Sequence, residues 1–143
     1  MTGSFADAFR RAGVSAVGLI HGSVCLIKDE LIAFPEERLP KAKRTKHPIR
    51  TVLVLSCDED CKDPFRHSVL VAPISSSINK ARTDFPVGAG ARGLARNSFV
   101  RLGHIQPALK VDIKATLGML DDEMMAQIHA VIMANLGIIS RPP

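Results

Sequence analysis

The sequence predicts a small α+β domain, mainly β, in which short antiparallel strands form a barrel-like sheet and one helix ends the chain. Three observations support this prediction. Several short apolar runs are separated by polar, glycine or proline residues, one later segment has helical periodicity, and 143 residues suit a single domain. The apolar fraction of 46% is ample for a packed core.

Residues 1-20 are expected to form an N-terminal appendage to a domain that spans residues 21-143. Ser4 to Arg11 could form a short helix that Gly13 ends. Arg10-Arg11 precede an apolar stretch from Ala12 to Ile20, as in a signal peptide. That stretch is short, contains Gly and Ser, and is followed by no A-x-A-like cleavage site, so no secretory signal is expected.

Two apolar runs form the centre of the predicted sheet. Thr51 to Leu55 and Ser68 to Ala72 are short, rich in Val and Leu, and bounded by polar residues, as buried strands are. The polar stretch from Cys57 to Ser68 can act as a turn between them. Pro73 is expected to end the pairing of the second run, and Gly22 to Ile27 is predicted to be the first strand.

Shorter segments complete the predicted sheet. Strands are expected at Asp84 to Val87, at Ser98 to Leu102 and at Val111 to Ala115. The last of these alternates apolar and polar side chains, as a half-buried strand does. Gly88 to Gly93 is predicted to be a turn.

The final helix is the clearest local prediction. Asp121 can cap its N-terminus, Asp122 and Glu123 place negative charge in the first turn, and Gly137 can end it. Apolar residues recur at helical spacing: Met124, Ile128, Val131, Ile132 and Leu136. We interpret the methionines as packing residues rather than ligands.

The segment between the first two strands is expected to be a mobile loop with a strongly basic second half. Pro35, Pro40 and Pro48 argue against a long helix there. The window from Lys41 to Arg50 sums to +5, which equals the net charge of the whole chain. Because this window lies directly before a central strand, it favours a polyanion site over a solvated run of charge.

Arg50 and the serines after the second central strand form the candidate catalytic site. If the two strands are neighbours, the Arg50 guanidinium lies near the hydroxyls of Ser75 and Ser76, an arrangement that can hold and cleave a phosphodiester. The alternative roles are a structural arginine and turn serines. His47 could be a general base or a surface loop residue.

Further basic residues are candidate contacts for the phosphates of a polyanion. They lie in the predicted loop and after the serine motif: Lys43, Arg44, Lys46, His47, Lys80 and Arg82. Aromatic residues make up 4% of the chain and are all Phe, which counts against a single-strand binder that acts mainly by base stacking.

The cysteines favour a reducing, cytoplasmic environment rather than a metal centre. Three cysteines without a secretory signature are typical of cytoplasmic proteins, and Cys25 is expected to be buried in a strand. Possible ligands cluster with loose spacing and no second pair completes them: Cys57, Cys61, Asp58, Asp60 and His67. No metal is therefore expected. No cofactor is expected either, since the glycine-rich segment from Gly88 to Gly93 lacks the surrounding βα unit of a dinucleotide-binding loop. No run approaches the roughly 18 apolar residues of a membrane span.

The order and spacing of these segments resemble the MazF/PemK/Kid family of toxins from toxin–antitoxin pairs, from about Gly22 to Gly137. Arg50 to Ser56 is similar to the family's Arg-Pro-apolar-Val-Leu-Ser strand, and Val71 to Ser76 to its Val-x-Pro-x-Thr/Ser-Thr/Ser motif. Three further segments resemble family elements: Gly22-Ser23-Val24, Gly93 to Leu102, and Leu117-Gly118-Met119-Leu120.

The resemblance implies a dimeric, SH3-like barrel that cleaves single-stranded mRNA without a metal. In the family the 2′-hydroxyl attacks the adjacent phosphate and leaves a 2′,3′-cyclic phosphate and a 5′-hydroxyl. The family's catalytic Arg falls on Arg50 and its Thr/Ser on Ser76, with Ser75 as a near alternative. Its mobile loop falls on Leu31 to Ile49. The implied partners are RNA, a second copy and an acidic antitoxin, with DNA reached only through the antitoxin.

The chain departs from the family pattern at several positions. Thr51 replaces a Pro, Ser98 and Phe99 replace an Asp-Gln pair, and a downstream Trp is absent. The missing pair bears on RNA sequence preference and leaves open a non-catalytic, regulatory member. A gyrase-poisoning relative of the same fold uses a C-terminal aromatic tip, which Leu136-Gly137-Ile138 lacks.

Overall fold

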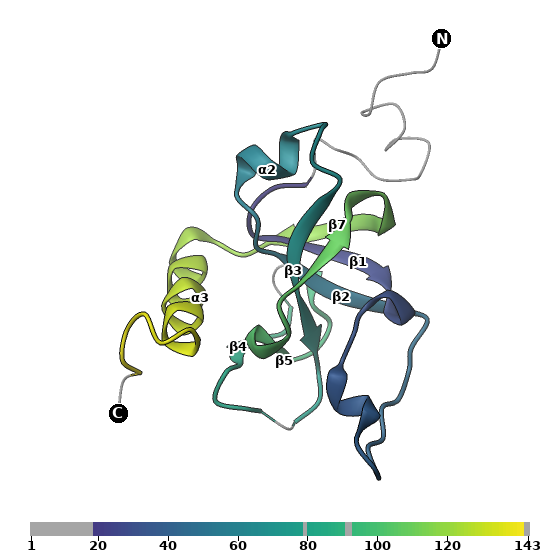
Figure 1. Ribbon diagram of the computed structural model, residues 1–143. Helices are drawn as coiled ribbons and strands as arrows, with labels where there is room; N and C mark the ends of the chain where they lie inside the picture. Colours follow the sequence, from purple (N-terminus) through teal and green to yellow (C-terminus); the bar gives the residue numbers. More distant parts are fainter. Residues whose placement is uncertain (1–18, 79, 91–92, 142–143) are drawn as a thin grey trace.

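The computed structural model describes residues 19–78, 80–90 and 93–141, and these form one curved antiparallel sheet with a helix beside it (Figure 1). The strand order is β4-β5-β3-β2-β1-β7, and β6 pairs with β3. The strands are β1 Ser23–Lys28, β2 Ile49–Val54, β3 Ser68–Ser75, β4 Phe85–Val87, β5 Ser98–Val100, β6 Gln106–Leu109 and β7 Ile113–Met119. The helices are α2 Asp58–Lys62 and α3 Asp122–Asn135.

The predicted fold class, a mainly β, SH3-like antiparallel barrel with a C-terminal helix, is confirmed. Both central strands form as expected and pair with each other, with Leu53 opposite Ala72. Short 3-10 turns join the strands: η1 Asp29–Leu31, η2 Pro35–Arg38, η4 Leu102–His104 and η5 Lys110–Asp112. None of the helices in the described part has the length and apolar character needed to cross a membrane.

The apolar core lies on both faces of the central strands. Successive strand residues point to opposite faces, so Leu53 packs into the cluster under α3 while Val52 and Val54 pack into the cluster on the other face. Both sides of β2 are therefore covered. The predicted burial of Cys25 is confirmed, since it packs beside Val52.

Helix α3 follows its sequence signals closely. The Asp121 carboxylate accepts a hydrogen bond from the Met124 backbone N–H at 2.9 Å, as an N-cap does. Met125 and Ile128 are buried in the core, so Met125 acts in packing as expected. Gly137 follows the helix with φ +75°, the left-handed conformation typical of a helix end.

One detail of the predicted sheet was wrong, and two elements were not predicted. Pro73 does not end the pairing, because β3 continues to Ser75 and Pro73 lies opposite Val52. The Pro73 carbonyl accepts a hydrogen bond from the Arg101 N–H, so the backbone of Pro73 points away from β2. On that side the partner of β3 changes from β6 to β5, and a residue without an N–H is tolerated there. Strand β6 was not predicted. The turn between the central strands contains α2.

Two of the sequence predictions concern residues that the structure does not describe, wholly or in part. The helix predicted for Ser4 to Arg11 lies wholly outside the described residues, and the turn from Gly88 to Gly93 lies partly outside them. Leu19 is buried in the core cluster that contains Val52. The division of the chain at residue 20 stays a prediction.

Candidate functional site

A groove of about 1130 Å³ opens beside the start of β2 and the end of β3. Arg50, Ser75 and Ser76 all line it, as the sequence predicts. The strand register explains why, because Thr51 lies opposite Ile74 and therefore brings the residues on either side, Arg50 and Ser75, to the same level of the sheet. The groove is the candidate nucleic-acid site.

Arg50 is held in place by a buried carboxylate that the sequence analysis missed. The Asp29 side chain is 0% exposed, and its Oδ1 accepts a hydrogen bond from Arg50 Nε at 2.5 Å. Arg50 Nη1 lies 3.5 Å from the Ile74 carbonyl oxygen. Within the described residues Nη2 has no hydrogen-bond partner, so this part of the guanidinium remains available to an anion.

Asp29 also fixes the end of the loop that leads to β2. Its Oδ1 is ion-paired with Arg44 Nη2, and its Oδ2 accepts the His47 backbone N–H at 2.9 Å. Burial alone would raise the pKa of Asp29. Hydrogen bonds from Arg50 and His47 and the charges of Arg50 and Arg44 outweigh burial, so its pKa lies below the ordinary value of 3.8. Asp29 is therefore ionised at neutral pH.

An aromatic ring completes this arginine cluster. The Cζ atoms of Arg44 and Arg50 lie 4.4 and 5.0 Å from the centroid of the Phe34 ring. Both distances are within the range of a cation–π interaction. Phe34 thus orients the two guanidinium groups beside each other in the groove.

The loop from residue 29 to residue 48 runs from the end of β1 to the start of β2 (Figure 1, dark blue), and side-chain contacts dock it against η4 and β6. Gln106 exchanges two hydrogen bonds with the backbone of Ala33, at 2.8 and 3.1 Å. His104 Nε2 lies 2.8 Å from both carboxylate oxygens of Glu36, and this contact lowers the pKa of Glu36. Arg44 Nη1 also pairs with Glu37.

The two candidate serines differ in availability. Ser75 is half-buried, and its Oγ accepts the Ser77 backbone N–H at 3.2 Å. Ser76 is exposed, and its hydroxyl has no hydrogen-bond partner among the described residues. Ser76 therefore has the hydroxyl that a phosphate can reach.

A second buried arginine, Arg101, also lines the groove. Arg101 Nη1 pairs with Asp84 Oδ2 at 2.6 Å, and Nη2 donates to the Ser77 carbonyl at 3.2 Å. Its guanidinium also lies 5.2 Å from the Phe99 ring centroid. Sequence reasoning placed Arg101 in a strand and gave it no role, because nothing in a single sequence pairs it with Asp84.

The two positions that depart from the family pattern lie beside this arginine. Ser98 is buried, and its Oγ donates to the Arg96 carbonyl at 2.9 Å. Phe99 lies opposite Ser75 in the register between β3 and β5. An apolar ring thus stands next to the serine motif.

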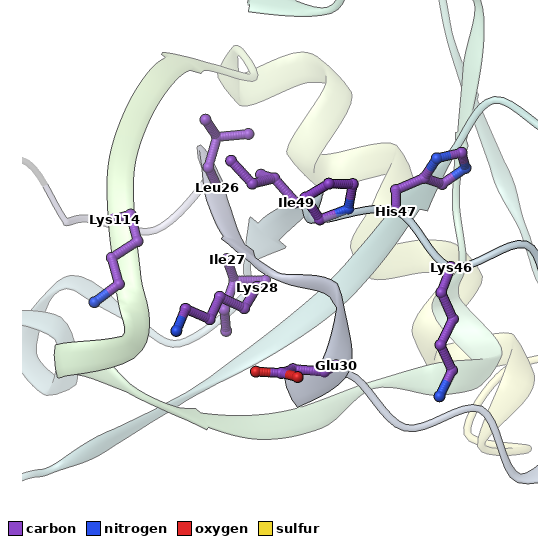
Figure 2. Close-up of a pocket in the computed structure, with 9 residues that line it drawn as sticks. Leu26, Ile27, Lys28, Glu30, Lys46, His47, Ile49 and Lys114 are labelled. Carbon is purple, nitrogen blue, oxygen red and sulfur yellow. The ribbon is translucent and has the colours of Figure 1, made fainter.

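The remaining basic candidates are divided among three places. Lys43, Arg44 and His47 line the groove. Lys46 lines a second pocket of about 500 Å³, which His47 also borders, and Figure 2 shows it with Lys28 of β1 and Lys114 of β7. Lys80 and Arg82 are exposed and line neither pocket, so the structure does not join them to the site.

The predicted cysteine cluster shows no sign of a metal centre in the described residues, where no group of three or more ligating side chains occurs. Cys61 is buried, and burial raises the pKa of its thiol to about 11. Its Sγ lies 3.5 Å from the Ser56 carbonyl. The expected absence of a metal from this cluster stays a prediction.

Comparison with known structures gives the same fold in toxins. A Mycobacterium tuberculosis toxin, MazF-mt6, is 19% identical, with a TM-score of 0.62 over 83% of this chain and 99% of that one. A mycobacterial endoribonuclease in complex with its cognate antitoxin is 15% identical, with a TM-score of 0.58 over 87% and 98%. At these identities the likeness shows the fold alone.

A third structure, an Mtb toxin, is 26% identical, with a TM-score of 0.52 over 58% of this chain and 88% of that one. No curated protein sequence matches the chain. The sequence model of the PemK-like, MazF-like toxins of type II toxin–antitoxin systems matches residues 32–136, a range that holds Arg50, both serines and helix α3. The chain therefore belongs to the PemK-like, MazF-like toxin family.

Proposed function

We propose that this toxin is a metal-independent endoribonuclease that cleaves single-stranded RNA in the groove, with mRNA as its target in the cytoplasm. The observation that carries the proposal is the oriented Arg50, whose Nη2 has no partner in the described residues and which lines the same groove as Ser75 and Ser76. Family membership and a neighbouring fold described as an endoribonuclease support it.

The cleavage step assigns one role to each of three side chains. Arg50 stabilises the negative charge that develops on the phosphate when the 2′-oxygen attacks, because its planar fork matches phosphate oxygens. Ser76 orients the phosphate through its exposed hydroxyl, with Ser75 beside it. The bond from phosphorus to the 5′-oxygen breaks, and that oxygen takes up a proton from water as it leaves. The products are a 2′,3′-cyclic phosphate and a 5′-hydroxyl.

The proton from the 2′-hydroxyl needs an acceptor, and two imidazoles line the described part of the groove. His104 has its Nε2 bound to Glu36, whereas His47 is exposed. We therefore assign proton acceptance to His47. Lys43, which is exposed, holds a neighbouring phosphate of the strand, and the charge of Arg44 lies beside it.

The proposed partners follow from the family and from the charge of the groove. A type II toxin is neutralised by a cognate antitoxin, and an acidic antitoxin segment suits a groove rimmed by Lys43 and Arg44. A second copy of the chain would form a homodimer. Contact with DNA would occur only through the antitoxin.

A second candidate is a non-catalytic binder of the same fold. The observation that favours it is the pair Ser98 and Phe99, since Ser98 is buried on a backbone carbonyl instead of offering a carboxylate to RNA. Such a protein would bind RNA, an antitoxin or a target such as gyrase without cleavage.

The test is cleavage of a long single-stranded RNA in EDTA by the wild type and by Arg50→Ala. Cuts at a short recurring sequence are expected from the wild type, and the variant should lose at least about 100-fold in rate. Circular dichroism checks that Arg50→Ala is folded. Absence of cleavage by folded wild type overturns the proposal in favour of the binder, and normal cleavage by the variant overturns the role of Arg50.

A further inference from the structure

Two histidines meet outside the groove. His21 lies just before β1, and His129 lies on the exposed side of α3. Their Nε2 atoms are 3.0 Å apart, and their ring centroids are 5.0 Å apart with the planes tilted by 32°. Neither residue borders the groove, and neither has a role in the proposed cleavage.

The tautomer of His21 is set by its backbone contacts. Its Nδ1 lies 3.0 Å from the Leu55 carbonyl oxygen and 3.3 Å from that of Ser56. Carbonyl oxygens only accept hydrogen bonds, so Nδ1 carries the proton. In the neutral ring the lone pair is then on Nε2, which faces His129. A backbone carbonyl that accepts Nδ1–H is the usual support of a metal-binding histidine.

His129 is the more adaptable of the two rings. The contact at 3.0 Å then uses an Nε2–H of His129 that donates to His21. Because His129 is exposed, this proton can move to its Nδ1 through water, which leaves two lone pairs directed at one point.

We propose that His21 and His129 form a two-histidine binding site for a divalent transition-metal ion of the Zn²⁺ or Ni²⁺ class. Metal–imidazole bonds of about 2.0 to 2.1 Å place two ligating nitrogens about 2.8 to 3.4 Å apart for angles between 90° and the tetrahedral value. The observed 3.0 Å already lies in this range. Water completes the coordination on the open side.

The choice of ion follows from the ligands. Imidazole suits Zn²⁺, Ni²⁺ and Cu²⁺, whereas Mg²⁺ and Ca²⁺ prefer oxygen. Two N–metal bonds form, the Nε2 proton of His129 moves to its Nδ1, and nothing is oxidised or reduced. The carboxylate of Asp58 accepts the His21 backbone N–H at 2.8 Å and adds a negative charge beside the cation.

The residues next to the two histidines are held in place by the fold. Gly22, next to His21, donates its N–H to the Val54 carbonyl at 2.9 Å, and Ile128, next to His129, is fully buried. A bound ion would therefore fasten α3 to the start of β1. Since only the folded state brings the two rings together, the ion should raise the midpoint of thermal unfolding.

The test is titration calorimetry of the untagged full chain with NiCl₂ and with ZnCl₂, and with MgCl₂ as the oxygen-preferring control. His129→Gln is the main variant because position 129 is exposed on a helix and the fold should tolerate it. Two matched controls remove other potential ligands: His67→Gln removes a histidine outside the pair, and Cys57→Ser removes the exposed thiol.

Saturable binding of one Ni²⁺ per chain is expected in the wild type, in His67→Gln and in Cys57→Ser, with at least about tenfold weaker binding in His129→Gln. The unfolding midpoint should rise with Ni²⁺ only where the pair is intact. No saturable binding by the wild type overturns the proposal, as does equal binding by His129→Gln or loss of binding in Cys57→Ser. No RNA is present, so the result is independent of the proposed cleavage.

Discussion

Two arginine–aspartate pairs contribute arginines that line the groove, and the pairs differ in what they leave available to a ligand. Arg50 pairs with Asp29 and Arg101 pairs with Asp84, and both arginines are nearly buried and lie over a Phe ring. Arg101 also donates through Nη2 to a backbone carbonyl, whereas Arg50 Nη2 has no partner in the described residues. The Arg101 pair therefore stabilises the fold, whereas the Arg50 pair leaves a hydrogen-bond donor available to a ligand.

The aspartates differ in the same way. Asp84 accepts one further hydrogen bond, from the Ala81 N–H at 2.8 Å, and so stabilises a local turn in the segment that follows the serine motif. Asp29 is shared by Arg50, Arg44 and the His47 backbone and so joins the basic loop to the candidate catalytic arginine. A rearrangement of the loop would therefore change the contacts of Asp29 and, through them, the orientation of Arg50.

Arg101→Ala should give the largest effect on folding. It leaves the Asp84 carboxylate buried without its cation, which costs about 3 to 5 kcal/mol in the free energy of unfolding. Urea unfolding followed by circular dichroism measures this loss. The matched variant is Arg50→Ala, which should lose much less stability because Asp29 keeps Arg44. Equal losses would mean that the two pairs are equivalent.

Asp29→Asn should destabilise the protein by about 1.5 to 3 kcal/mol, since charged hydrogen bonds to two arginines are weakened. The pKa of Asp29 is lowered on folding, so its stabilisation is fully present above the unfolded pKa near 3.8 and is lost as pH falls through the folded pKa. The difference between wild type and Asp29→Asn should therefore shrink at pH 3. Urea unfolding at pH 7 and pH 3 measures it, and a constant difference would contradict the lowered pKa.

Ser76→Ala and Ser75→Ala separate the two hydroxyls of the serine motif. Ser76 is exposed, so its loss should lower the cleavage rate about tenfold with little change in stability. Ser75 holds the Ser77 N–H, so its loss should cost about 1 kcal/mol in stability and less in rate. Single-turnover cleavage and urea unfolding of both variants give the comparison. The reverse pattern would assign the catalytic hydroxyl to Ser75.

Local sequence signals located the parts of the molecule that local physics determines. The apolar runs of β2 and β3 gave the central pair, and through it the common level of Arg50 and Ser75, because strand neighbours with a turn between them pair readily. Asp121 and Gly137 bounded α3 for the same reason. In each case the evidence lies within a few residues along the chain.

The parts that were missed depend on contacts between distant segments. Asp29 follows β1 in a polar run, and a charged residue at that position is exposed in most proteins. Only the arrival of Arg44 and Arg50, 15 and 21 residues later, makes its burial favourable. Strand β6 contains Pro107 and has no clear alternation, and it forms because β3 offers it an edge. Lys80 and Arg82 were predicted from charge alone, which does not locate a side chain.

Lys43→Ala should give the smallest effect, a weakening of RNA binding that is nearly independent of sequence. Lys43 lines the groove, as Arg50 does, and one lost phosphate contact should reduce the slope of log K against log salt by about 0.7 for a single strand. Binding to a short RNA by cleavage-deficient Arg50→Ala protein, with and without Lys43→Ala, measures this slope. Lys80→Ala is the matched control, because Lys80 is also exposed but borders neither pocket. An equal change of slope for both lysines would mean that RNA follows the outer surface, and the contrast between Arg50 and Arg101 would then no longer locate the binding site.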